Sequence, residues 1–111
     1  MSNYRSCYLT VKGISPMKQA ALEAALMSIN VFEIDAYIDK KQNTIEYATS
    51  DSVDWDTEDS DMCKLSTLFP NAVFQLETWS ADYCDKYFTY YKNGESEYCP
   101  LVPVAPKHIA W

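Results

Sequence analysis

The feature that most constrains the fold is residues 65–98, which combine a helix stop, extended segments and a tight turn. Pro70 and Asn71 interrupt an apolar helical pattern, and a proline at such a point ends a helix. Asn93 and Gly94 follow a tyrosine-rich segment and supply the positive φ angles that a type I′ hairpin turn requires. The expected strands of this stretch are residues 71–79, 86–92 and 95–99.

The preceding residues add two helices and three strands. Ser15 stands before Pro16 at a helix start, where the serine side chain is expected to accept a backbone amide hydrogen bond. Asn30 suits the left-handed residue that ends this helix. Its apolar stripe is Ala21, Leu22, Ala25, Leu26 and Ile29. The expected helices are residues 16–29 and 56–68, and the expected strands are residues 4–11, 31–39 and 44–49.

The periodic positions also predict the core. Residues 31–39 alternate strictly, which is typical of a half-buried strand with Phe32, Ile34, Ala36 and Ile38 on one face. The predicted core is Leu22, Leu26, Ile29, Phe32, Ile34, Ile45, Tyr47, Leu65, Phe69, Phe74 and Leu76. The element order predicts the fold class α+β. We expect a ferredoxin-like split βαβ sandwich, an antiparallel sheet with two helices on one face plus an extra C-terminal β-hairpin.

Length and composition suit one domain that needs no disulfide or metal to fold. The 111 residues are 48% apolar, enough for a core at this size. Residues 1–99 are expected to form the α+β domain. Residues 100–111 carry three prolines and are expected to be an extended tail that lies across the domain through Leu101, Val102 and Trp111.

The charge is strongly negative. Nine basic residues are scattered among sixteen acidic ones, for a formal net charge of −7, which argues against direct binding of nucleic acid. No signal-like segment and no apolar run of about 20 residues is present, so we expect a cytoplasmic protein without membrane contact. The four cysteines are then expected to be reduced.

Motifs for catalysis, metals and cofactors are missing from the sequence. The one histidine, His108, lies in the proline-rich tail, and no CxxC pair exists among Cys7, Cys63, Cys84 and Cys99. A disulfide between Cys84 and Cys99 is expected only under oxidation. Residues 54–59 resemble a calcium loop in their acids but lack its glycine and distant glutamate. We therefore expect no catalytic residues, no metal and no cofactor.

Two biased segments remain as candidates for binding. Residues 51–61 hold six acids and no base; they are either a loop and a solvated, acidic first helical turn, or a protein-binding surface. Tyrosines near residues 87–91 are either packed strand residues or exposed anchors for a protein partner. The candidate partner-binding residues are Asp51, Asp54, Asp56, Glu58, Asp59, Asp61, Tyr87 and Tyr91.

The segments Leu68-Phe69-Pro70-Asn71, Tyr87-Phe88 and Tyr91-Lys92-Asn93-Gly94 resemble the YubB-type ferredoxin-like domains of small phage- and plasmid-borne proteins. The resemblance covers about a third of the chain and implies the fold, but it brings no catalytic residues with it. As a small, acidic, solitary domain, the chain is also similar in type to phage inhibitors of host defence, including anti-CRISPR proteins.

Three functions follow from these expectations. The first is a non-enzymatic inhibitor that covers a basic, nucleic-acid-binding protein surface, such as that of a nuclease or a CRISPR-type complex. The second is an accessory or structural domain whose acids serve solubility, and the third is a small enzyme without a recognisable site. The sequence leaves the identity of the partner and the oligomeric state open.

Overall fold

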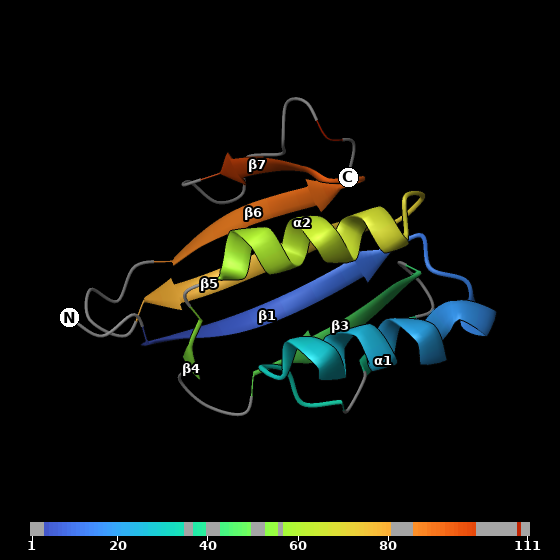
Figure 1. Cartoon of the computed structure of the whole chain (residues 1–111), viewed down its shortest axis with the longest axis horizontal. Helices are drawn as coiled ribbons and strands as arrows, with labels where there is room; N and C mark the ends of the chain where they lie inside the picture. Colours follow the sequence, from blue (N-terminus) through green and yellow to red (C-terminus); the bar gives the residue numbers. More distant parts are fainter. Residues whose placement is uncertain are drawn as a thin grey trace.

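The computed structural model describes residues 4–34, 37–39, 43–49, 53–55, 57–80, 86–99 and 109. Within them the chain is an α+β protein with two α-helices and one antiparallel sheet (Figure 1). The strands are β1 (Tyr4–Lys12), β2 (Tyr37–Asp39), β3 (Thr44–Ala48), β4 (Val53–Asp54), β5 (Val73–Ser80), β6 (Lys86–Lys92) and β7 (Glu95–Cys99). The helices are the 3₁₀ turn η1 (Pro16–Lys18), α1 (Gln19–Ile29) and α2 (Glu58–Leu68).

The strand order is β2-β3-β1-β5-β6-β7, and the short β4 pairs with the start of β1. Every described pairing is antiparallel. β1 is flanked by β3 and β5, so the connection through α1 passes over β3 to reach β2 at the sheet edge. This arrangement is compatible with a ferredoxin-like sandwich.

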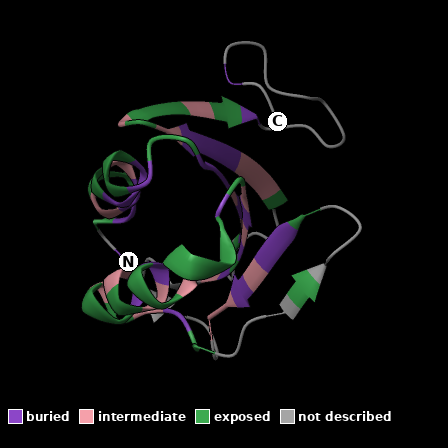
Figure 2. Cartoon of the chain, turned by 90° about the vertical axis from the view of Figure 1, so that its right-hand side faces the viewer, coloured by how far each residue is buried: buried purple, intermediate pink, exposed green. Residues whose placement is uncertain are grey.

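Both helices lie on the same, concave face of the curved sheet (Figure 2). We call this the helix-covered face and the opposite one the open face. On β1, Cys7, Leu9 and Val11 alternate toward the helices and are fully buried, as the period of two requires. The core prediction is confirmed for Leu22, Leu26, Phe32, Ile45, Tyr47, Leu65, Phe69, Phe74 and Leu76, with Ile29 partly buried against them.

The strand predicted at residues 31–39 is largely wrong, and so is the core position of Ile34, which is exposed. Among the described residues of this segment, only Tyr37–Asp39 pairs as a strand, while Phe32 makes an isolated bridge with Thr49. The ring of Phe32 instead packs edge-on against Trp55, at 5.5 Å between centroids. This contact holds the chain at Phe32, and the described residues that follow it, Glu33 and Ile34, belong to no strand.

The ends of α1 follow one prediction and contradict another. Asn30 is left-handed, with φ 65°, and its amide donates to the Leu26 carbonyl at 3.0 Å, as expected for the helix end. The Ser15 side chain makes no cap hydrogen bond, contrary to the prediction. The Ser15 carbonyl accepts from the Lys18 amide at 3.0 Å instead, because η1 closes a tight 3₁₀ turn through the backbone.

The turn between β6 and β7 is fastened to α2. Asn93 and Gly94 both have positive φ, 47° and 84°. The Gly94 amide donates to the buried Ser66 hydroxyl at 2.8 Å, and that hydroxyl donates to the Cys63 carbonyl at 2.8 Å. The end of the β6–β7 pair is thereby held against the C-terminal half of α2.

A second, smaller cluster covers part of the open face. Val73, Tyr90, Cys99 and Ile109 are buried together, with Phe88 packed beside them. The Ile109 amide donates to Glu97 Oε1 at 3.0 Å, which fixes this tail residue to β7. One residue of the tail therefore packs on the domain, whereas Leu101, Val102 and Trp111 lie outside the described residues.

Candidate functional site

An open groove of about 530 Å³ lies between the N-terminal half of α2 and the strands β6 and β7. Figure 1 shows α2 beside this strand pair. The groove is lined by Trp55, Glu58, Asp59, Tyr87, Thr89, Tyr91, Ser96 and Tyr98. We call it the acidic–aromatic groove, since it contains two carboxylates, four aromatic rings and no basic residue among the described positions.

Strand register explains why these side chains meet. Tyr87, Thr89 and Tyr91 occupy alternate positions of β6 and therefore point to the helix-covered face. Across the strand pair, Tyr98 stands opposite Thr89 and Ser96 opposite Tyr91. The two strands together form one wall of the groove, and the first turns of α2 form the other.

Two tyrosines form the accessible aromatic part. The rings of Tyr87 and Tyr98 lie 5.2 Å apart at 63°, an edge-to-face pair. Tyr98 is 59% exposed, while Tyr87 is half-buried. The pair presents aromatic surface to solvent beside the carboxylates of α2.

The carboxylates come from the start of α2, where the helix dipole favours negative charge. Asp59 is exposed, whereas Glu58 is only 8% exposed, so the expectation of a fully solvated first turn is wrong for Glu58. Glu58 is buried because the first turn of α2 lies against β6. The groove therefore has one buried and one accessible carboxylate.

Tyr91 is 1% exposed, and the prediction that it is an exposed anchor is wrong. Its position on β6 places it under α2, where it belongs to the main core as well as to the groove floor. Burial, the negative charges of Glu58 and Asp59 and a hydrogen bond with Asp59 all raise the pKa of Tyr91 well above its ordinary value. The phenol therefore stays protonated and can donate to Asp59.

Trp55 lines the groove near the start of α2, where Asp61 holds it in place. The Trp55 Nε1–H donates to Asp61 Oδ2 at 2.9 Å, and the Thr57 hydroxyl donates to the same oxygen at 2.6 Å. Trp55 is buried, and its hydrogen bond to Asp61 fixes it against the start of α2. Asp61 thus anchors the segment before α2 and does not line the acidic–aromatic groove.

The predicted binding residues are only partly brought together. Glu58, Asp59, Tyr87 and Tyr91 line one groove, which joins the two sequence segments proposed for binding. Asp54 is in β4 as backbone, and its side chain, like Asp51 and Asp56, lies outside the described residues. Tyr98 is not among the predicted binding residues, although the two-residue turn at Asn93-Gly94 fixes its place opposite Thr89.

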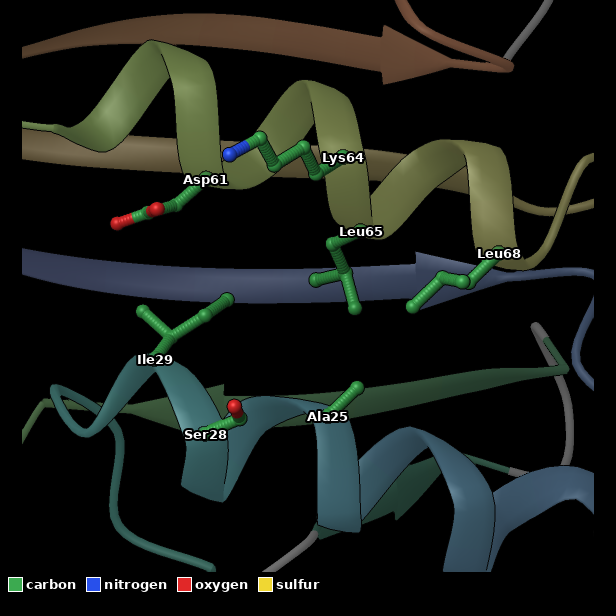
Figure 3. A pocket seen from close by; sticks show the side chains of 7 residues that line it. All are labelled: Ala25, Ser28, Ile29, Asp61, Lys64, Leu65 and Leu68. Atoms are coloured by element: carbon green, nitrogen blue, oxygen red, sulfur yellow. The ribbon is translucent and has the colours of Figure 1, made fainter.

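A second hollow, of about 280 Å³, separates the two helices (Figure 3). Leu65 and Leu68 reach from α2 toward α1, and Ala25 and Ile29 reach back. Asp61 and Lys64 are its charged residues, and Asp61 already accepts two hydrogen bonds. This hollow is lined by apolar, polar and charged side chains of both signs, and none of its described lining residues is aromatic.

Trp79, an exposed aromatic residue of the open face, is less suited to binding than the groove tyrosines. The Trp79 Nε1–H donates to Glu77 Oε2 at 2.7 Å, and Lys86 Nζ lies 4.9 Å from the centroid of the Trp79 ring. The same ammonium lies 5.9 Å from the Phe88 ring. Trp79 is thus already engaged in a local cation–π contact.

The described residues contain no group of three or more His, Cys, Asp and Glu side chains that could hold a metal ion. Cys7, Cys63 and Cys99 form no disulfide among the described residues. Burial raises the pKa of Cys63, with Asp59 adding to the effect, and burial and Glu97 raise the pKa of Cys99. These two thiols are therefore weak nucleophiles near neutral pH. His108 and Cys84 lie outside the described residues.

No helix in the described part of the chain has the length and apolar character needed to cross a bilayer. Comparisons with protein-family models, with curated proteins and with solved structures find no match for this chain. The acidic–aromatic groove is the feature on which a functional proposal can be built.

Proposed function

We propose that this protein is a non-enzymatic, acidic binding module that covers a basic protein surface which otherwise takes nucleic acid. The observation that carries the proposal is the acidic–aromatic groove. It places the carboxylates of Glu58 and Asp59 beside the exposed ring of Tyr98, in a chain of net charge −7. Charge of this density steers association with a basic partner and makes binding sensitive to salt.

The aromatic residues supply what charge alone does not. Surface carboxylates remain well hydrated and contribute little affinity each, whereas aromatic side chains at the centre of an interface exclude water and act as anchors. Tyr98 and Tyr87 are the accessible rings of the groove. An interface centred on them would bring Glu58 and Asp59 of α2 against the partner's basic surface.

We further propose that the fold is the ferredoxin-like split βαβ sandwich with a C-terminal hairpin, and that the protein belongs to a phage or a plasmid. The β2-β3-β1-β5 order supports the first statement. The second rests on the resemblance at residues 68–71 and 91–94 to YubB-type domains. The partner class is then a cytoplasmic host nuclease, CRISPR-type complex or other nucleic-acid-processing complex.

A structural or accessory role is the second candidate, and one observation favours it. Asp61 bonds both Trp55 and Thr57, and Glu58 is buried, so part of the acidic segment stabilises the start of α2. In this alternative the remaining acids only keep the protein soluble.

Capture from a bacterial lysate, with and without competing duplex DNA, separates the two candidates. The tagged protein is expected to enrich nucleic-acid-binding proteins, and added DNA or salt should release them. The test variant carries Asp56→Asn and Asp59→Asn, and it spares the structural Glu58 and Asp61. The matched control carries Glu33→Gln and Glu95→Gln, which remove the same charge from exposed sites outside the groove.

The proposal predicts that the test variant loses most of the capture at low salt and the control keeps it. Equal capture by both variants, or capture that DNA does not compete, would contradict the proposal and favour the accessory role. Circular dichroism of each variant checks that the fold is unchanged.

A further inference from the structure

We infer that the acidic–aromatic groove is a receptor for an arginine side chain of the partner. This inference rests on the proposed function and names the chemistry recognised at the same site. The groove volume of about 530 Å³ falls in the range of clefts that hold small ligand groups. Its occupant must suit both aromatic faces and carboxylates.

The arrangement of the rings selects a cation. Tyr87 and Tyr98 meet at 63° with centroids 5.2 Å apart, so two ring surfaces of different orientation border the same space. The negative face of an aromatic ring attracts a cation placed over it. Trp55 and Tyr91 continue the aromatic lining toward α2, and none of the described lining residues is basic.

The carboxylates add charge complementarity at the opposite wall. Asp59 is exposed beside the aromatic pair, while the buried Glu58 adds negative potential with reduced solvent screening. An anionic occupant would be repelled by the two carboxylates, and a neutral apolar occupant would displace their water without replacing its hydrogen bonds. A cation is favoured by every charged group that lines the groove.

Arginine suits this geometry better than lysine. The guanidinium is planar, so it can stack on one tyrosine while its edge donates two parallel hydrogen bonds to a carboxylate. The guanidinium is also less strongly hydrated than an ammonium group, so it loses less hydration free energy on entering a partly buried groove. A basic surface that contacts phosphates contains such arginines, which links the groove to the partner class proposed above.

The test is a titration with three short peptides of alternating residues, followed by NMR of the tyrosine rings and the Trp55 indole. One peptide carries arginine and glycine, one lysine and glycine, and one the neutral isostere citrulline and glycine. The arginine peptide is expected to shift the Tyr98, Tyr87 and Trp55 signals and to bind about three-fold or more tighter than the lysine peptide. The citrulline peptide should not bind.

Matched variants separate the groove from general acidity. Tyr98→Leu should weaken the arginine peptide about two- to five-fold, whereas Tyr8→Leu, at a similarly exposed tyrosine of the open face, should leave affinity unchanged. Asp59→Asn should weaken it by a similar factor, whereas Glu95→Gln, which removes the same charge outside the groove lining, should have a smaller effect.

Equal binding of the arginine and lysine peptides would overturn the assignment to arginine. Equal effects of Tyr98→Leu and Tyr8→Leu would overturn the groove as the receptor. Both failures are distinguishable from failure of the proposed function. If Tyr98→Leu still captures the DNA-competed lysate proteins while the Asp56→Asn, Asp59→Asn variant does not, the acidic binding module stands, and the arginine receptor and the anchoring role of Tyr98 are wrong.

Discussion

The substitution Leu65→Ala tests the rotational setting of α2, on which the groove depends. Leu65 is 2% exposed and points from α2 toward α1 (Figure 3). Replacing a buried leucine by alanine costs about 2–5 kcal/mol through lost burial and the cavity left behind. Because the helix keeps a good helix former at this position, the loss reports packing and not helix propensity.

Leu68 provides the matched control, because it has the same side chain on the same helix but is 64% exposed. Leu68→Ala should change the free energy of unfolding by no more than about 0.5 kcal/mol. Urea denaturation followed by circular dichroism measures both variants. With an m-value of about 2 kcal/mol/M, Leu65→Ala should lower the midpoint by about 1–2.5 M and Leu68→Ala by about 0.25 M or less.

An equal or larger loss for Leu68→Ala would refute this setting of α2. It would also remove the site, because Glu58 lies two helical turns before Leu65 on the same helix face. A rotated helix would carry Glu58 and Asp59 away from β6. The experiment therefore checks the position of the carboxylates through a residue that takes no part in binding.

Three further predictions address other contacts. Ser66→Ala should lower the free energy of unfolding by about 1–3 kcal/mol in urea denaturation, because the Gly94 amide loses its buried acceptor. The pKa of Tyr91 is raised in the folded protein, so stability should fall as pH rises above the ordinary tyrosine value of 10.0, where the unfolded chain loses this proton first. Tyr91→Phe should make that decline shallower in urea melts between about pH 9 and 11, and an unchanged pH slope would contradict the assignment. Ile109→Ala should cost about 1–3 kcal/mol if its contact with the open face is as described, and equal midpoints for variant and parent would contradict it.

The sequence predicted the elements whose periodicity matches their burial. In β5, Phe74 and Leu76 face the helices while Val73, Gln75, Glu77 and Trp79 face away, as the alternation indicates. Each of these side chains points to one face of the sheet, so alternation along the strand is sufficient to predict which face it occupies. The C-terminal end of α1 was predictable for a similar reason, since Asn30 takes a left-handed conformation through local sterics.

Long-range packing accounts for most of the differences between the predicted and the observed secondary structure. Residues 31–39 have a strand's alternation, but the contact between Phe32 and Trp55 ties the chain at a point where only an isolated bridge forms. β4 has two residues, Val53 and Asp54, which is too short for any periodic signal. Sequence periodicity cannot report contacts between segments so far apart.

The candidate site likewise combines features that follow from the local sequence with features that depend on long-range packing. That Tyr87 and Tyr98 share a face follows from the turn at Asn93-Gly94, which the sequence contains. That Tyr91 is buried depends on where α2 lies on the sheet, and no local pattern encodes this. The acidic residues were recognised in composition, but their division into structural and accessible groups depends on Trp55, Thr57 and β6.

Amide hydrogen exchange of the protein, free and bound to the partner it captures, tests the central claim most directly. The first-turn amides of α2 lack intrahelical acceptors and should exchange readily in the free protein. We predict that binding slows exchange in the first half of α2 and in β6 and β7, with no change in α1 or β3. Protection confined to α1, to β3 or to the hollow between the helices, with exchange at Glu58 and Asp59 unchanged, would contradict the account.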